Sequence, residues 1–194
     1  MYLKSKRNQY LSKVAGVFDP IFEHRNGLSE AKRFLTKLDP QAEKFNFRII
    51  GDNYSGNISG SIDSNYKYLQ QKNSEGCGIF VTINETDGIG LKKDNIVRVR
   101  AIFLDFDDNS RDIVSAINSM PIEPSIIVCT SSRKFHCYFL VKDCPLDEFT
   151  NIQKFFNHKF NADPSVNDLP RIMRLPGFYH NKGNPFYSHI VGES

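Results

Sequence analysis

Two aspartates follow an apolar segment, Ala101 to Leu104, in the run Asp105-Phe106-Asp107. Aspartate is depleted in strands, and a strand projects residues i and i+2 from the same face, so both carboxylates would lie side by side. Two like charges this close need a cation. Mg²⁺ and Mn²⁺ take oxygen ligands and leave positions open for phosphate oxygens. The pattern favours a metal site. The alternative is a strand that ends at Leu104, with the acids in a solvated turn before a helix cap at Asn109-Ser110.

A second candidate segment is Ser131-Ser132-Arg133-Lys134-Phe135-His136. If Phe135 and its alternates face the core, strand alternation sends His136 and Tyr138 to the other, open face of the sheet. A histidine beside two hydroxyls and two cations is suited to binding polyphosphate. A surface turn with an incidental histidine is the alternative.

A third segment runs from Ala162 to Lys182 and combines acids, cations, His180 and amides around apolar positions. Arg171 and Arg174 are three residues apart and would share one face of a helical turn, and guanidinium groups hold phosphate bidentately. A solvated loop is the alternative for this segment alone. Acids for a metal and clustered cations for phosphate together favour nucleotidyl chemistry.

The elements that would position these segments follow the order β-α-β-β-α. We expect a strand over 97–107, a helix over 111–120, strands over 125–130 and 135–141, and a helix over 146–160. The four-residue connection 131–134 predicts an antiparallel hairpin. This order indicates an α+β sheet with helices on one face, close to the split βαβ, ferredoxin-like arrangement.

The first half of the chain is less regular. It predicts a helix capped by Ser29 and ending before Asp39-Pro40, a strand over 45–50, a helix over 62–72 and a strand over 79–83. The Gly-, Ser- and Asn-rich stretch 51–65 reads as a surface loop rather than a domain linker.

Composition sets the outer limits. The chain has 194 residues, 25 Lys+Arg against 22 Asp+Glu and a net charge of +3, which suits one domain over 1–194 and argues against a histone-like binder. No stretch approaches the ~18 apolar residues of a membrane helix. Residues 1–16 are basic without a secretory apolar core, so we expect a cytoplasmic protein. The cysteines match no zinc pattern.

The motifs resemble a known family. Asp105-x-Asp107, then Ser131, Lys134 and His136, then Asp163 and Arg171-x-x-Arg174-x-Pro176-Gly177 with Asn181-Lys182 look like the archaeo-eukaryotic primase superfamily. The closest likeness is to its primase-polymerase branch on plasmids and phages, the RepB-like primases. Segments 34–40 and 78–88 also look like that branch, so the resemblance spans roughly 28–183.

The resemblance implies a nucleotidyltransferase, a DNA primase or polymerase. It would carry out template-directed synthesis from nucleoside triphosphates on single-stranded DNA, in replication of a plasmid, phage or other mobile element. It implies a single primase-polymerase catalytic domain with an N-terminal αβ portion over about 1–95 and an RRM-like, mixed or antiparallel catalytic half over about 96–194. It further implies a two-metal site for Mg²⁺ or Mn²⁺. A helicase domain or protein is a possible partner, since relatives often stand at the front of a longer replication protein.

The resemblance also implies roles for single residues. Asp105 and Asp107 would bind the metals with a third acid, Asp163, for which Asp168 is the alternative. His136, with Ser131, Ser132, Lys134, Arg171 and Arg174, would bind the triphosphate, and Arg133, Asn181 and Lys182 would bind nucleic acid. Arg133 stands where many relatives have a small residue.

Two other functions stay open from the sequence. The apolar strand with its D-x-D end, 102–107, is also typical of haloacid dehalogenase-like phosphatases, although these have Thr or Val where this chain has Asn109. A non-catalytic nucleic-acid-binding module could stack bases on Phe106 and Tyr138. Acids at the centre of such a sheet would repel phosphates in the absence of metal.

Overall fold

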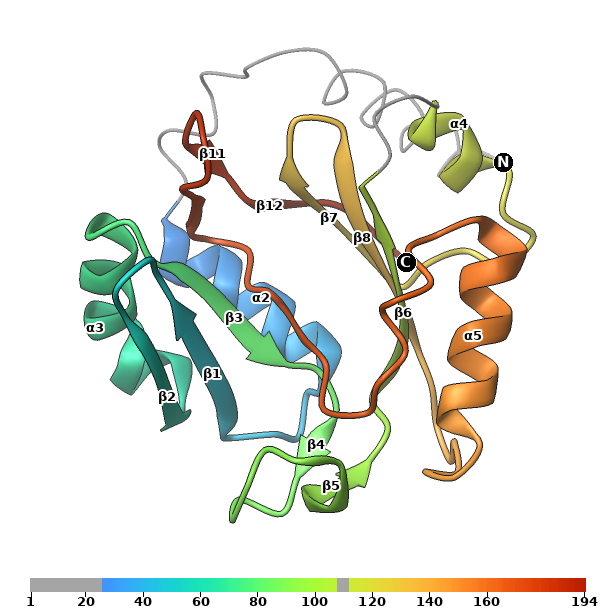
Figure 1. Cartoon of the computed structure of the whole chain (residues 1–194), viewed down its shortest axis with the longest axis horizontal. Coiled ribbons are helices and arrows are strands. Elements are labelled where there is room, and N and C mark those ends of the chain that lie inside the picture. Colours follow the sequence, from blue (N-terminus) through green and yellow to red (C-terminus); the bar gives the residue numbers. More distant parts are fainter. Residues whose placement is uncertain (1–25, 108–111) are drawn as a thin grey trace.

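The computed structural model describes residues 26–107 and 112–194. The expectations for residues 1–16, for the cap at Asn109-Ser110 and for the phosphatase position Asn109 lie outside these ranges. Figure 1 shows two sheets side by side with helices packed around them.

The first sheet is antiparallel and has the strand order β2-β1-β3-β9. Alternate residues of β1, namely Phe45, Phe47 and Ile49, are buried, as the period of two in a strand requires. The last strand comes from far along the chain and joins the edge next to β3. The bounds are β1 Phe45–Ile50, β2 Ser55–Gly60, β3 Gly78–Thr82 and β9 Ile172–Arg174.

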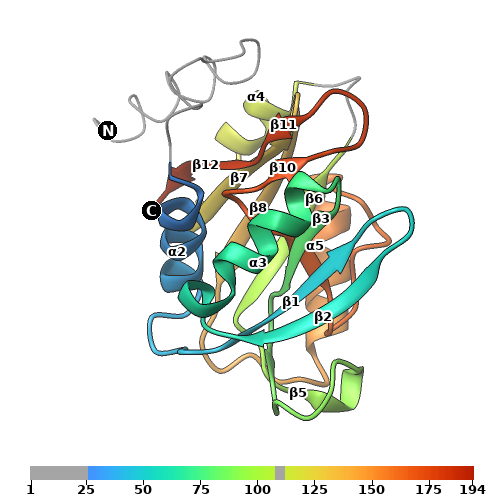
Figure 2. The ribbon, with the colours of Figure 1, turned by 90° about the vertical axis from the view of Figure 1, so that its left-hand side faces the viewer.

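Two helices belong to this half of the molecule. In α2, Gly27–Leu38, the buried positions include Phe34, Leu35 and Leu38, and in α3, Ile62–Ser74, the Ser61 side chain accepts from the Ser64 N–H as an N-cap. The expected cap at Ser29 is wrong, because Asn26 caps α2 one turn earlier by accepting from the Leu28 N–H. Figure 2 shows α3 lying across β1 and β2.

The second sheet has the order β12-β7-β8-β6, and each neighbouring pair is antiparallel. Strand β8 lies between β6 and β7, which are joined through α4, as in a split βαβ unit. The chain is therefore an α+β protein, as expected, and the RRM-like character of this half stays a prediction. The bounds are β6 Ala101–Phe106, α4 Ile113–Asn118, β7 Ile126–Ser131, β8 Lys134–Leu140, α5 Phe149–Phe160 and β12 His189–Glu193.

Short elements connect the sheets. A two-stranded arm consists of β4, Glu85–Thr86, and β5, Ile96–Arg98, with a 3₁₀ turn at Lys93–Asn95 between them. A second pair consists of β10, Tyr179–His180, and β11, Phe186–Tyr187.

Both faces of the second sheet are covered, so the expectation of helices on one face is wrong. Tyr138 and Phe139 are successive residues of β8 and point to opposite faces. Tyr138 packs edge-on against Phe34 of α2, with ring centroids 5.1 Å apart, and Phe139 packs against Phe156 of α5 at 5.4 Å. The face that carries His136 and Tyr138 is consequently buried rather than open.

Three further expectations fail locally. The stretch 51–65 contains β2 and the start of α3, because its polar residues form a half-exposed edge strand. The strand expected over 97–107 breaks between β5 and β6, where Arg100 turns inward to form an ion pair with Asp39. Residues 172–174 are strand β9 rather than a helical turn, because they pair with β3.

One contiguous cluster of buried apolar side chains spans both sheets. In the described ranges, no helix has the length and apolar character needed to cross a membrane.

Candidate active site

A cavity of about 170 Å³ lies between the two sheets. Its walls come from strands β3, β6, β7, β8 and β9 and from the β10–β11 hairpin. The lining side chains are two carboxylates, three cations, two imidazoles and five others: Asp105, Asp107, Lys134, Arg171, Arg174, His136, His180, Phe80, Thr130, Val166, Ile172 and Met173.

Strand register brings the acids to the basic residues. Asp105 pairs with His136 across β6 and β8, and their side chains approach to 3.6 Å between Oδ1 and Nε2. Two residues further along, the Lys134 Nζ lies 3.3 Å from Oδ2 of Asp107. Cross-strand partners project from the same face of a sheet, so both acids face the cavity together with their partners.

Asp105 is unusual for a carboxyl group. Burial, then the negative charges of Asp107 and Asp163, raise its pKa to about 7. Its buried Oδ1 has no hydrogen-bond partner. A buried, unsatisfied carboxylate oxygen beside a second carboxylate has the chemistry of a hard-cation ligand.

The protein alone does not complete a metal cage in the part of the chain that the structure describes, where no three His, Cys, Asp or Glu side chains are grouped closely enough. Asp105 and Asp107 therefore fit a divalent ion that takes its remaining ligands from water and phosphate oxygens, as Mg²⁺ commonly does.

His136 is buried, and its Nδ1 lies 3.2 Å from the Tyr138 hydroxyl. Burial, followed by the nearby Arg174 and His180, lowers the pKa of His136 to about 3. The imidazole is therefore neutral at pH 7. If the Tyr138 hydroxyl donates to Nδ1, the N–H at Nε2 faces Asp105 and the cavity.

Arg174 supplies a fixed positive charge. Its guanidinium lies over the Phe80 ring, 4.7 Å from the centroid, a geometry that favours a planar cation. Burial lowers the pKa of Arg174 to about 10, with Asp105 and Asp107 acting in the opposite sense, so the group is charged at pH 7. Arg171 reaches the same cavity, and its Nη2 donates to the Ser165 carbonyl at 2.6 Å.

The two candidates for a third acid lie differently. The Asp163 backbone N–H donates to the Asp105 carbonyl at 2.9 Å, and its charge helps to raise the Asp105 pKa. Its Oδ1 accepts from the Ser165 N–H at 2.8 Å. Asp168 instead forms an ion pair with Arg171. Neither side chain lines the cavity. The charge of Asp163 contributes to the raised pKa of Asp105, which favours Asp163 over Asp168 as the acid nearer to the site.

A buried amide network holds β6 from its open edge. The Gln153 side chain of α5 accepts from the Phe103 N–H at 3.1 Å and donates to the Phe103 carbonyl at 2.5 Å. It also donates to Asn157, which in turn donates to the Val166 carbonyl at 2.9 Å. Three outward backbone groups of this strand, the Phe103 N–H, the Phe103 carbonyl and the Asp105 carbonyl, are thus satisfied by Gln153 and Asp163 without a neighbouring strand.

Other expected site residues lie outside the cavity. Ser131 ends β7, and Ser132 and Arg133 form the tight turn to β8, where Arg133 has a φ of 61°. The Asn181 amide donates to the Asn73 carbonyl at 2.8 Å and ties the β10–β11 hairpin to α3. Lys182 is exposed in the same hairpin.

Residues that sequence reasoning did not assign to the site come mainly from this hairpin and from β3. The His180 Nδ1 lies 3.2 Å from the Thr130 carbonyl, and burial followed by Arg174 lowers its pKa. His180 stands in the third candidate segment, so the clustering of polar residues there was a usable signal. The sequence around Phe80 and Thr130 contained no signal of a functional site, because an aromatic residue or a threonine inside a strand usually belongs to the core.

Comparisons with known proteins agree on the fold. Residues 63–192 match the family described as the RepB DNA-primase N-terminal domain. No curated protein matches the chain.

Three solved structures are similar. The crystal structure of primase RepB′ has a TM-score of 0.67 at 19% identity over 86% of this chain, which spans only 56% of that one. The catalytic domain of primase RepB′ in complex with initiator DNA has a TM-score of 0.66 at 19% identity, over 87% of this chain and 86% of that one. The AEP domain of the cyanophage S-2L primase-polymerase has a TM-score of 0.71 at 18% identity, over 86% and 90%.

Proposed function

Because the chain belongs to the RepB DNA-primase N-terminal domain family, and so to the nucleotidyltransferases, we propose that it synthesises primers or extends them on a single-stranded DNA template. The nucleoside triphosphate would bind in the cavity at Asp105. The chain spans 56% of the length of the primase RepB′ chain. We also propose, without a direct observation for either, a helicase partner and a role in plasmid or phage replication.

One arrangement carries this proposal. Asp105 and Asp107 lie on one side of the cavity, and Arg174, Lys134 and Arg171 line the same small space. Phosphoryl transfer needs little covalent chemistry from the protein and depends on positioning and charge neutralisation. The cavity of about 170 Å³ is lined by acids that can bind a metal and by cations that can bind phosphate, so it can supply both the positioning and the charge neutralisation.

Asp105 and Asp107 would hold Mg²⁺ or Mn²⁺, with Asp163 as our choice for the third acid. Bound divalent ions would activate the attacking 3′-hydroxyl and neutralise the departing pyrophosphate. The raised pKa of Asp105 means that this carboxyl group carries a proton part of the time at pH 7 when no cation is bound. Binding a cation releases that proton.

The remaining groups would bind and orient the triphosphate. Arg174 presents a planar guanidinium whose direction is fixed by the Phe80 ring, which suits bidentate binding of phosphate oxygens. The neutral His136 contributes a hydrogen-bond donor at Nε2 rather than a charge. The Lys134 side chain is 29% exposed and forms an ion pair with Asp107. Its ammonium group could leave this ion pair and bind a phosphate of the triphosphate instead.

The hairpin residues would serve the nucleic acid. Arg133 and Lys182 stand outside the cavity in two turns, and Asn181 directly precedes Lys182. Ser131 and Ser132, expected at the triphosphate, are not in the lining of the cavity either. Lys182 is near enough to His180 to contribute to the lowering of its pKa. Cations just outside the cavity suit contacts to phosphates of the template strand next to the reacting nucleotide.

The direct test is primer-free synthesis on single-stranded DNA, with Mg²⁺ or Mn²⁺ and with ribonucleotides or deoxyribonucleotides offered separately. We expect template-dependent products that disappear with EDTA. Products of the same length in the absence of template, or no products from any nucleotide set with or without a primer, would contradict the proposal.

The two alternatives lose their support. A haloacid dehalogenase-like reading has β6 as an apolar strand ending in D-x-D, but β6 is the edge of an antiparallel sheet. A base-stacking module needs exposed aromatics, whereas Tyr138 is 0% and Phe106 is 2% exposed.

A further inference from the structure

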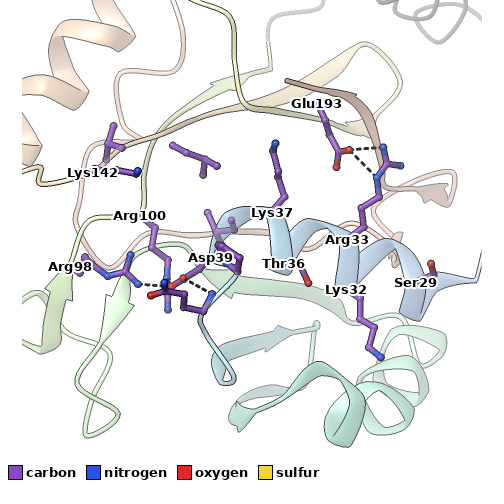
Figure 3. Close-up of a pocket in the computed structure, with 15 residues that line it drawn as sticks. Ser29, Lys32, Arg33, Thr36, Lys37, Asp39, Arg98, Arg100, Lys142 and Glu193 are labelled. Carbon is purple, nitrogen blue, oxygen red and sulfur yellow. Dashed lines mark hydrogen bonds and ion pairs between the residues drawn. The ribbon is translucent and has the colours of Figure 1, made fainter.

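A second, larger cavity has no residue in common with the candidate active site. It measures about 1020 Å³ and lies along the exposed face of α2, next to the last strand β12 and the end of β8 (Figure 3). We call it the basic groove. Its cationic residues are Lys32, Arg33, Lys37, Arg98, Arg100 and Lys142.

The groove and the active site lie at opposite ends of the same strands. Arg100 directly precedes β6 and Leu140 ends β8, whereas Asp105 and His136 lie at the other ends of these strands. Five residues at about 3.3 Å each separate Arg100 from Asp105 by roughly 17 Å along the strand. Whatever binds in the groove cannot be the reacting triphosphate.

The charge of the groove is positive. Six cationic side chains line it, against the carboxylates of Asp39 and Glu193 in the lining, and Asp63 and Glu85 pair with Lys32 and Arg98 from outside it. Arg98 and Arg100 both pair with Asp39, at 2.5 and 2.7 Å, and Arg98 also pairs with Glu85 at 2.6 Å. Arg100 is 4% exposed and forms part of the wall, whereas the Arg98 side chain is 50% exposed. The cations that face solvent are Arg98, Lys142 and, on α2, Lys32 and Arg33, whereas Lys37 is half-buried.

Three of the cations in the groove, Arg33, Lys37 and Lys142, are held weakly or not at all. Arg33 donates from Nε and Nη2 to Glu193 at 3.0 and 2.7 Å, but its side chain is 49% exposed. Lys37 contacts the Ser194 carbonyl at 2.6 Å. Exposed ion pairs contribute little to stability, so Arg33 can exchange its partner for a phosphate. Lys142 is exposed and pairs with no residue that the structure describes.

The helix also sets a repeat. Ser29 and Arg33 are four residues apart, as are Lys32 and Thr36, and Arg33 and Lys37, so each turn of α2 presents donors toward the groove. A helical turn rises about 5.4 Å, which is on the scale of one nucleotide step. Hydroxyls and cations in rows are typical contacts to phosphate and sugar oxygens.

The groove lacks the features that would select a peptide or read bases. Among the described residues, no aromatic side chain lines it, so bases have nothing to stack on there. Of its apolar members, Leu38, Leu140 and Val141 are buried or half-buried, and Pro40 is exposed. A protein partner needs an apolar pocket for its anchor residues. We therefore propose that the basic groove binds the sugar–phosphate backbone of single-stranded DNA, independently of sequence, away from the active site. This proposal rests on the proposed function only for the choice of DNA as the polyanion.

The test is a pair of charge reversals with equal net charge. Lys37→Glu with Lys142→Glu alters the groove, and Lys67→Glu with Lys154→Glu alters two exposed lysines on α3 and α5. Binding of a labelled mixed-sequence oligonucleotide is measured by fluorescence anisotropy between 50 and 200 mM salt. The groove variant should bind about 10-fold more weakly at low salt. Its salt slope, the slope of the logarithm of the binding constant against the logarithm of the salt concentration, should be smaller in magnitude by about 1.4, as expected for two lost phosphate contacts.

The control variant should stay within about twofold of the unaltered chain. Equal weakening by both variants, or none by the groove variant, would overturn the proposal. So would a polyglutamate peptide that competes as well per charge as the oligonucleotide. Because Lys37 contacts Ser194, Lys142→Glu alone is the second variant: it breaks no contact and should lower the slope by about 0.7.

The outcome is separable from that of the proposed function. Asp105→Asn with Asp107→Asn should retain the full salt slope of binding even though synthesis is lost. If the unaltered chain makes no product but the two reversals differ as described, the groove stands and the proposed function fails. If it makes product but the reversals behave alike, only the groove fails.

Discussion

The Nε2 of His136 lies 3.6 Å from Oδ1 of Asp105, across two neighbouring strands of one sheet. Burial pushes both groups toward their neutral forms, because it lowers the pKa of the imidazole to about 3 and raises that of the carboxyl group to about 7. The two side chains therefore face each other as largely neutral groups rather than as a salt bridge, and Oδ1 of Asp105 has no hydrogen-bond partner.

The first prediction concerns His136 itself. Because its pKa is far below the usual 6.5, the ring should stay neutral throughout pH 5–8. Nitrogen chemical shifts of the imidazole measure this directly, with the exposed His158 as the internal control. A midpoint for His136 between pH 6 and 7 would contradict the buried, neutral assignment.

The second prediction concerns the stability of the metal-free protein. A carboxyl group whose folded pKa exceeds its unfolded value of 3.8 costs stability as pH rises through about 4 to 7. Asp105→Asn should therefore raise the free energy of unfolding in EDTA at pH 8, by at most about 4 kcal/mol. Mg²⁺ should stabilise the unaltered chain and have little effect on Asp105→Asn.

Urea unfolding of both proteins at pH 8 and at pH 4 provides the measurement, and Asp147→Asn is the exposed control. The difference between the unaltered chain and Asp105→Asn should shrink toward pH 4. A variant that is less stable than the unaltered chain at pH 8 in EDTA would refute this account of Asp105.

The third prediction concerns Gln153, which has a 0% exposed side chain bonded to both backbone groups of Phe103. Gln153→Leu would leave those groups and the Asn157 amide without their partner. The expected loss is about 2–4 kcal/mol in the free energy of unfolding, since each buried unsatisfied group costs about 1–3 kcal/mol. Gln70→Leu on the exposed face of α3 should change it by less than about 0.5 kcal/mol.

The fourth prediction concerns Asp39 and its arginines. Burial raises the pKa of Asp39, but hydrogen bonds from Arg100 and Arg98 outweigh burial and hold it below 3.8. Its contribution to stability is thus present above pH 4 and lost as pH falls through the folded pKa. Asp39→Asn should destabilise the chain by about 3–5 kcal/mol at pH 7, because Arg100 keeps a buried charge.

Chemical unfolding from pH 7 down to pH 3 checks this sign. The gap between the unaltered chain and Asp39→Asn should narrow below pH 4. A gap that stays constant over the whole range would show that Asp39 acts through packing rather than through its charge.

The fifth prediction concerns Arg174. Arg174→Gln should raise the KM for the nucleoside triphosphate by roughly 10-fold or more, since a charge-assisted bidentate contact is lost. Arg174→Lys should recover part of this, because it keeps the charge but not the planar contact with Phe80. Arg48→Gln, in the first sheet, is the control. Equal KM values for all these variants would remove Arg174 from the triphosphate site.

Much of the second sheet could be predicted from sequence because its signals are local. The apolar runs that became β6, β7 and β8, and the four residues between β7 and β8, determine strand type and pairing through periodicity and loop length. The same alternation places Asp105 and Asp107 on one face, where both line the cavity.

What could not be predicted depends on contacts between distant segments. Strand β9 becomes a strand only by pairing with β3, about ninety residues earlier, so Arg171 to Arg174 looked like a helical turn. Tyr138 is buried because Phe34 covers it, and Arg100 breaks the expected strand because Asp39 is its partner. Tertiary context overrides local propensity in each of these cases.

The measurement that tests the central claim most directly is the initial rate of nucleotide incorporation by Asp105→Asn with Asp107→Asn on single-stranded template. Oligonucleotide binding is measured in parallel, and Asp52→Asn with Asp147→Asn is the matched control on two exposed acids. We predict that incorporation by the active-site variant falls by at least about 10³-fold, that its DNA affinity stays within about twofold, and that the control retains the rate of the unaltered chain. Undiminished incorporation by the active-site variant would contradict the assignment of the metal-binding acids and, with it, the proposed function of this cavity.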